Sequence, residues 1–224
     1  MDWTAIALSV RLAAIVSVAL LLIGPPIAYW LTFSTRRWKF AVESLVALPL
    51  VLPPTVLGFY LLVALGTRSP IGRAWEHWTG HGLAFTFEAL VVASILYSLP
   101  FSVQPIASSF ALIDRALLEA SSTLGASPMR TFRKVVLPLS IDGIVAAGVL
   151  TFAHTLGEFG VVLMVGGNLP GITRTVSISI YDDVQALDFS SAHQTALFLL
   201  AVSYAALAFV YGVKRKPWAV APLP

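Results

Sequence analysis

The sequence of 224 residues contains no cysteine, and only 11% of its residues are charged. Without cysteine the chain can form no disulfide framework, thiol nucleophile or thiolate metal site. Soluble domains carry about 25% charged residues, so the low charge argues against a soluble protein. The chain also lacks a G-x-x-x-x-G-K-[ST] phosphate loop, which argues against nucleotide binding. The H-E-x-x-H and G-x-S-x-G patterns of common hydrolases are absent as well, which argues against an intramembrane enzyme.

Apolar residues make up 58% of the chain, and most of them fall in long uninterrupted runs. An apolar helix needs about 20 residues to cross a membrane. Five stretches are long enough to be spans: residues 4–33, 41–65, 89–110, 141–166 and 192–213. The sequence therefore predicts an all-α, polytopic transmembrane helix bundle with five core spans.

Two of these stretches contain prolines, which a transmembrane helix tolerates only with help from its neighbours. The first stretch contains Gly24-Pro25-Pro26, and the second contains Pro49 and Pro53-Pro54. Kinks or breaks are expected at these positions. If the first stretch divides at Gly24, the bundle has six helices instead of five.

The lysines and arginines gather on one side of the predicted bundle. Ten of the 14 lie in the connections 34–40 and 111–140 and in the tail 214–216. Cytoplasmic loops of membrane proteins are rich in basic residues, so these ten are assigned to the cytoplasm. With five spans, the N-terminus is then outside and the C-terminus is cytoplasmic. The formal net charge is only +3, and the loops account for it, so nucleic acid is not expected as a partner.

The connection 111–140, called loop 111–140 below, has the signals of two short helices joined by a tight turn. Helix formers and the spacing of its apolar residues predict a helix over 111–124 that ends at Gly125. Ser127 is a suitable N-cap and Pro128 a suitable first residue for a second helix, which ends at Leu137-Pro138. An amphipathic loop that rests on the lipid surface is the alternative.

The same loop carries most of the pattern Glu-Ala-Ala, three residues, Gly, nine residues, Ile, one residue, Leu-Pro. This pattern resembles the cytoplasmic loop of ABC importer permeases, although Ser121 and Val135 replace an alanine and the isoleucine. The resemblance implies that a helix of the loop seats in a groove of an ATPase subunit. The residues expected to serve this coupling are Glu119, Ala120, Ser121, Gly125, Ala126, Arg130, Leu137 and Pro138.

Further motifs are similar to those of molybdate-type permeases, the ModB-type inner-membrane components of binding-protein-dependent transport. They include Leu-Pro-Leu-Val-Leu-Pro-Pro at 48–54 and Gly-Gly-Asn-Leu-Pro-Gly at 166–171, together with segments 83–88, 97–101 and 152–160. The resemblance covers about residues 9–199 and implies a bundle of the type I ABC importer permease kind. It also implies one permease domain over residues 1–224, with loop 111–140 as its ATPase-docking part.

The function implied by this resemblance is import of a tetrahedral oxyanion across the cell (inner) membrane, with molybdate favoured and tungstate or sulfate as alternatives. Two copies of the chain would form the pore in the lipid bilayer as a homodimer. Two ABC ATPase subunits would bind beneath, and an external oxyanion-binding protein would deliver the substrate. ATP-Mg would bind the ATPase, so this chain is expected to be non-catalytic and to hold no cofactor. A stand-alone channel or ion-coupled carrier is a further alternative, and loop 111–140 argues against it.

Polar side chains within a membrane span are costly and are therefore candidates for the transport pathway or its gate. The candidates are Thr151, His154, Thr155 and Glu158 in the fourth stretch, with Arg174 in the outer connection that follows. His154 and Glu158 are four residues apart, so they are expected to share a helix face.

For each candidate a plainer role remains open. His154 and Glu158 could tie helices together by hydrogen bonds, and Arg174 could contact the binding protein or simply be solvated. A carboxylate about 4 Å from an oxyanion would repel it by about 4 kcal/mol at an effective dielectric constant of about 20, so Glu158 is not expected to touch the substrate. Two metal ligands without a third do not make a zinc site, so no metal is expected.

Overall fold

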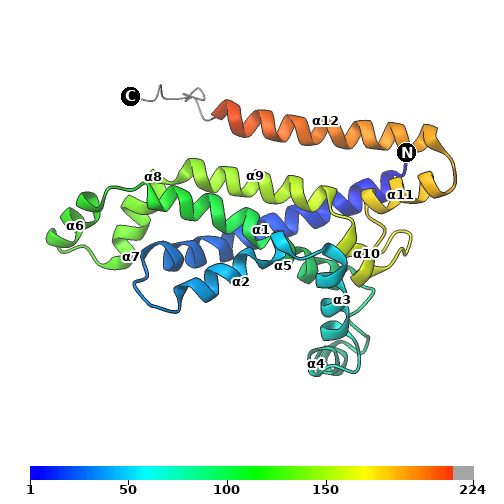
Figure 1. The fold of residues 1–224 in the computed structure, drawn as a ribbon, viewed down its shortest axis with the longest axis horizontal. Coiled ribbons are helices and arrows are strands. Elements are labelled where there is room, and N and C mark those ends of the chain that lie inside the picture. The colour runs from blue at the N-terminus through cyan, green and yellow to red at the C-terminus, as the bar shows by residue number, and fades with distance from the viewer. Residues whose placement is uncertain (214–224) are drawn as a thin grey trace.

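The computed structural model describes residues 1–213, and every regular element in this range is helical. The basic tail 214–216, which contributed to the predicted orientation, lies outside the described residues. Figure 1 shows an elongated bundle in which the long helices run side by side. The elements are α1 (Trp3–Phe33), α2 (Lys39–Val51), α3 (Pro54–Leu65), α4 (Pro70–Thr79), α5 (Phe87–Ala111), α6 (Arg115–Thr123), α7 (Pro128–Thr131), the π-helix η1 (Phe132–Val136), α8 (Leu137–Leu139), α9 (Ile141–Gly157), α10 (Gly160–Gly166), α11 (Val176–Gln185) and α12 (Phe189–Val213).

Three helices of the described chain, α1, α5 and α12, are each long and apolar enough to cross a membrane. Two bent helix pairs bring the number to five if each pair is one span: α2 with α3, and 128–139 with α9. The predicted all-α transmembrane bundle is therefore confirmed.

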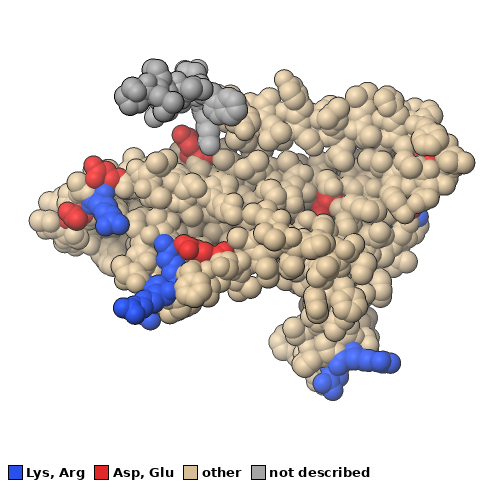
Figure 2. Space-filling model, viewed as in Figure 1, with Lys and Arg blue, Asp and Glu red and all other residues tan. Residues whose placement is uncertain are grey.

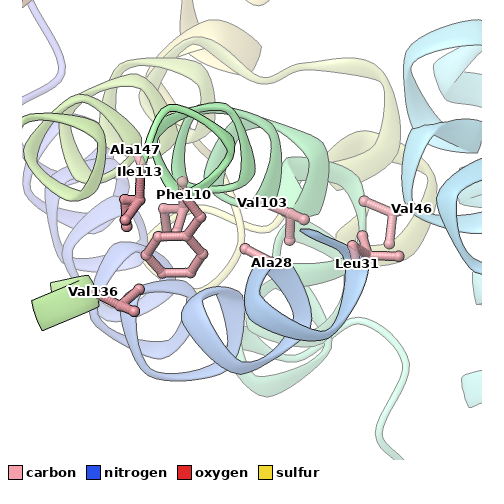
Figure 3. Packing of buried hydrophobic residues seen from close by; sticks show 9 residues of the cluster. Ala28, Leu31, Val46, Val103, Phe110, Ile113, Val136 and Ala147 are labelled. Atoms are coloured by element: carbon pink, nitrogen blue, oxygen red, sulfur yellow. The ribbon is translucent and has the colours of Figure 1, made fainter. Parts of the chain in front are cut away.

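The core of the bundle lies where α1, α5 and α9 pack against one another. One apolar cluster joins Ala28 and Leu31 of α1 to Val103 and Phe110 of α5 and Ala147 of α9 (Figure 3). Lipid chains are as apolar as these side chains, so close packing and interhelical hydrogen bonds stabilise such contacts more than burial from water does.

Helix α1 runs without a break through its two prolines, so the six-helix alternative is wrong. A neighbouring helix supports this region: the hydroxyl of Ser102 on α5 donates to the Leu20 carbonyl at 3.0 Å. Gly24 allows that approach, because a Cβ at this position would collide with Ser102. Tertiary packing therefore keeps the helix continuous where the local sequence favours a break.

The second predicted stretch is broken, as its prolines indicated. Helices α2 and α3 meet at Leu52 and Pro53 with a bend of 112°. Helix α3 then packs on α10. Gly58 and Gly160 permit this contact, because a Cβ on either one would lie 2.7 Å from a carbon atom of the facing helix.

The fourth stretch was expected to be one span over 141–166, and this expectation is wrong. Helix α9 ends at Gly157, Glu158 is extended with ψ 139°, and α10 begins only at Gly160. Two glycines beside this break lower the local helix propensity. A hydrogen bond from Ser94 to Glu158 holds the break against α5. The connection that follows contains a helix, α11, which packs on α12 and α1.

Candidate functional site

Loop 111–140 projects from one end of the bundle, opposite the N-terminus of α1 (Figure 1). Its first helix, α6, is shorter than the helix predicted over 111–124. The chain leaves α5 after Ala111, and the Asp114 carboxylate then caps a new helix by accepting the Ala116 N–H at 2.9 Å. This local cap stops the continuous helix that the composition of the segment favoured.

The turn after α6 is a Schellman motif centred on Gly125. The Gly125 N–H donates to the Ser122 carbonyl at 2.9 Å, and the Ala126 N–H donates to the Ser121 carbonyl at 3.1 Å. Gly125 has a φ of +75°, which favours glycine because it has no Cβ. The predicted helix stop at Gly125 is confirmed.

The second helix of the loop starts as predicted. Ser127 is the N-cap and its hydroxyl accepts the Arg130 N–H at 3.4 Å, and Pro128 is the first helical residue. The hydroxyls of Ser121 and Thr131 lie 2.8 Å apart and join α6 to α7. Ser121, where the family pattern has alanine, therefore supplies a contact that alanine could not make.

The expected coupling residues lie on an accessible surface. Ser121, Ala126 and Leu137 are half-buried, and the exposed members are Glu119, Ala120, Gly125, Arg130 and Pro138. Two apolar side chains stand out at the tip: Leu124 is 87% exposed and Met129 is 65% exposed. A rigid turn with exposed apolar side chains is suited to contact with another protein.

The base of the loop is joined to the membrane helices through an aromatic residue. Phe132 of η1 lies edge-on to Tyr29 of α1 at 5.2 Å between ring centroids and to Phe110 of α5 at 6.2 Å. Val136 and Ile113 complete this packing (Figure 3). Phe132 therefore links the base of the loop to α1 and α5.

A second group of candidates forms a polar cluster between α5 and α9. It comprises Ser94 and Ser98 of α5 with His154, Thr155 and Glu158. The Ser98 hydroxyl lies 3.0 Å from His154 Nδ1 and 3.0 Å from Thr155 Oγ1, and Ser94 donates to Glu158 Oε2 at 3.1 Å. The role of Ser94 was not foreseen, although serines recur every four residues along α5, at 94, 98 and 102, which places them on one helix face.

Glu158 lies at the end of α9, not within the helix, so the expected shared helix face with His154 is incorrect. Both residues still contact the serine face of α5. Glu158 is only 5% exposed, and its Oε1 has no hydrogen-bond partner among residues 1–213. The hydroxyl of Thr151 is also buried and unpartnered within this range.

The side chain of His154 is held between aromatic rings. The Phe101 ring stacks on the imidazole at 3.8 Å between centroids and an angle of 24°, and the Tyr97 ring lies 5.1 Å away. No group of three or more potential metal ligands occurs within the described residues. The cluster offers hydroxyl and imidazole groups for hydrogen bonds, together with one carboxyl group.

Arg174 is part of a compact network at the end of the bundle opposite loop 111–140. Its Nε donates to Asn168 Oδ1 at 2.7 Å, and its terminal nitrogen lies 3.4 Å from Asp182 Oδ2. The Asn168 amide donates to both carboxylate oxygens of Asp182, at 2.8 and 2.9 Å. The guanidinium of Arg174 therefore fixes the loop before α11, and no sequence pattern identified its partners Asn168 and Asp182.

The basic side chains are concentrated near the ends of the molecule. In Figure 2, most blue side chains lie towards the end with α6 and α7 and near α4, and the helices between them show few charged side chains, most of them acidic. The connection between α1 and α2, which holds Arg36 and Arg37, lies towards the same end as loop 111–140 (Figure 1).

The chain is similar to known transport proteins over almost its whole length. The sequence profile described as "Binding-protein-dependent transport system inner membrane component" matches residues 21–216. The chain is 50% identical to the molybdenum transport system permease protein ModB of Azotobacter vinelandii over 214 residues, covering 96% of this chain and 95% of that protein. It is 40% identical to ModB of Mycobacterium tuberculosis, covering 96% and 80%, and 37% identical to ModB of Escherichia coli K12, covering 82% and 80%.

Solved structures share the fold at low sequence identity. A bacterial ABC transporter that imports the acidic polysaccharide alginate is similar with a TM-score of 0.70 and 18% identity, covering 96% of this chain and 79% of that one. An inward-facing MetNI methionine ABC transporter is similar with a TM-score of 0.68 and 18% identity, covering 94% and 95%.

Proposed function

The chain belongs to the family of binding-protein-dependent transport system inner membrane components, and we propose that it is the membrane-spanning subunit of an ATP-driven importer of molybdate. The observation that carries the proposal is the 50% identity to a ModB protein over 96% of the chain. Tungstate and sulfate are the alternative substrates, because both are tetrahedral dianions like molybdate. ATP hydrolysis belongs to a separate ATPase chain.

Loop 111–140 is the site where the ATPase docks. The Schellman turn at Gly125 and the Ser121–Thr131 contact fix the relative directions of α6 and α7, so the loop is preorganised for a partner. The exposed Leu124 and Met129 supply apolar contact area. Movement of the docked ATPase reaches the membrane helices through Phe132, which packs on both α1 and α5.

This assignment sets the orientation of the chain in the inner membrane. The end with loop 111–140 faces the cytoplasm, and the N-terminus of α1 at the opposite end is outside. The basic α1–α2 connection, which lies towards the cytoplasmic end, supports this orientation. The network of Arg174 then lies on the outer side, where the external binding protein delivers its oxyanion.

The translocation pathway lies between two copies of the chain and passes the polar cluster. An oxyanion needs hydrogen-bond donors along its path, and hydroxyl, imidazole and backbone N–H groups can supply them without a fixed positive charge. Glu158 serves this pathway indirectly, because its bond to Ser94 holds the break between α9 and α10 in place. Its carboxyl group is nearly sealed and is not a substrate contact.

Uptake by reconstituted vesicles tests the proposal. The chain, its ATPase and its binding protein are placed in proteoliposomes, and uptake of radiolabelled molybdate, tungstate and sulfate is measured with and without ATP. We expect molybdate uptake that needs both ATP and the binding protein. Equal uptake in vesicles without the ATPase would establish a stand-alone carrier instead, and a preference for sulfate would overturn the substrate assignment.

A further inference from the structure

The imidazole of His154 has one ring nitrogen fixed by neighbours and one left open. Nδ1 lies 3.0 Å from the Ser98 hydroxyl, which in turn lies 3.0 Å from the Thr155 hydroxyl. Nε2 makes no hydrogen bond with any residue in the range 1–213, and it is not among the buried unpartnered atoms. The open nitrogen therefore reaches accessible space beside the packed helices.

The direction of the hydrogen bonds among His154, Ser98 and Thr155 decides which imidazole nitrogen carries the proton. Ser98 and Thr155 each have one hydroxyl proton to donate. If Thr155 donates to Ser98 and Ser98 donates to Nδ1, both protons are used. In the reverse direction, from Nδ1 through Ser98 to Thr155, the Thr155 proton has no acceptor among the described contacts although this residue is only 2% exposed. A buried unpaired donor is costly, so the first direction is favoured and Nε2 carries the proton.

The depth of His154 limits what this N–H can face. His154 is the fourteenth residue of α9, and at about 1.5 Å per residue it lies roughly 20 Å from the cytoplasmic start of the helix. Its partner Ser98 lies about 16 Å from the outer start of α5. In a hydrocarbon core about 30 Å thick both residues are near the middle. An unpaired N–H at this depth is not stable against lipid, so it faces the polar pathway.

We propose that the Nε2–H of His154 is a neutral donor that binds an oxygen of the tetrahedral oxyanion at the middle of the membrane, with Ser98 and Thr155 as the residues that position its proton. The proposal rests on the function proposed above. Stacking on Phe101 and the nearby Tyr97 restrict rotation of the ring, so the donor direction is preorganised. A single neutral donor also binds a dianion weakly enough to release it, as conduction through a pathway requires.

The test compares two substitutions that differ in the donor they leave. In His154→Gln the amide N–H can occupy the place of Nε2–H, whereas His154→Leu keeps the bulk and removes the donor. We expect the glutamine variant to take up molybdate within about threefold of wild type. The leucine variant should need a roughly 10- to 100-fold higher molybdate concentration for half-maximal uptake, the range for one lost hydrogen bond to a charged group. His193→Leu, on an exposed face of α12, is the matched control and should behave as wild type.

Each outcome bears on the proposal. Wild-type uptake by the leucine variant, or an equal loss in both variants, overturns the donor role. Absence of molybdate uptake by the wild-type complex refutes the proposed function itself, so the two failures are distinguishable. If the leucine variant fails to assemble, ¹⁵N NMR of histidine-labelled wild-type complex decides the matter, with the His154 signals assigned by their loss in the glutamine variant. An Nε2-protonated tautomer whose shift responds to added molybdate supports the proposal, and an Nδ1-protonated tautomer or an unresponsive signal contradicts it.

Discussion

Substitution of Gly125 by valine should weaken ATPase binding through backbone strain alone. Gly125 has a φ of +75°, and no atom lies within 4 Å of the position that a Cβ would occupy. A Cβ at this position meets no steric clash, so the main cost comes from the left-handed conformation. For a residue with a Cβ this cost is about 1–2 kcal/mol.

The strain changes the population of the docking conformation. A cost of about 1–2 kcal/mol corresponds to a factor of roughly 5–30 in an equilibrium. If the ATPase binds only the loop with an intact Schellman turn, its dissociation constant rises by up to that factor. Gly125→Asn should recover most of the affinity, because asparagine adopts the left-handed conformation more readily than other residues with a Cβ.

Gly80 provides a matched control on the same chain. It also has a positive φ, +78°, with no atom within 4 Å of a Cβ, but it ends α4, far from loop 111–140 (Figure 1). Gly80→Val should carry the same strain and leave ATPase affinity unchanged. Titration of the ATPase against each variant in nanodiscs measures the effect. Wild-type affinity for Gly125→Val, or an equal loss for Gly80→Val, would show that the left-handed turn at Gly125 does not hold the loop in its docking conformation.

Three further predictions concern the membrane domain. Glu158→Gln keeps an acceptor for the hydroxyl of Ser94, so assembly and uptake should persist. Ser94→Ala removes the donor and should lower the stability of the complex in thermal unfolding by about 1–3 kcal/mol. Normal assembly with altered uptake in the Glu158→Gln variant would contradict a structural role for Glu158. Gly160→Ala places a Cβ 2.7 Å from a proline on α3 and should destabilise the complex by about 1–3 kcal/mol. Gly157→Ala meets no atom within 4 Å and should leave the stability unchanged. Equal melting temperatures of the two variants would contradict this expectation. A backbone N–H in the first turn of α12 donates to Asp188 and lowers the pKa of its carboxyl, so this cap contributes stability at neutral pH and loses it as the pH falls through the lowered pKa. Asp188→Asn should therefore reduce the loss of unfolding free energy at acidic pH. An unchanged loss at acidic pH would exclude this cap as its source.

Loop 111–140 could be predicted in detail because its signals are local. The positive φ at Gly125, the cap at Ser127 and the first-turn Pro128 each depend on residues within a few positions along the chain. The start of α6 was placed too early, because a single cap at Asp114 outweighed the helix-forming composition around it.

The membrane helices were harder to predict, because their breaks depend on neighbours that are distant in sequence. The two prolines of α1 suggested that this stretch divides into two helices. The helix is instead continuous, and Ser102 of α5 donates a hydrogen bond to it. The run 141–166 had no proline, yet the chain breaks at Glu158, whose partner Ser94 is 64 positions away. Arg174 was recognised as a candidate, but its partner Asp182 could be found only from the folded chain.

In the function proposed above, this chain couples ATP hydrolysis on a partner to the passage of molybdate. The most direct test measures ATP hydrolysed and molybdate accumulated in the same sealed vesicles, with the binding protein outside and wild-type complex in the membrane. We expect accumulation above the external concentration that begins with hydrolysis and stops when ATP is exhausted. Accumulation at the same rate without ATP, or hydrolysis that never moves molybdate, would contradict it.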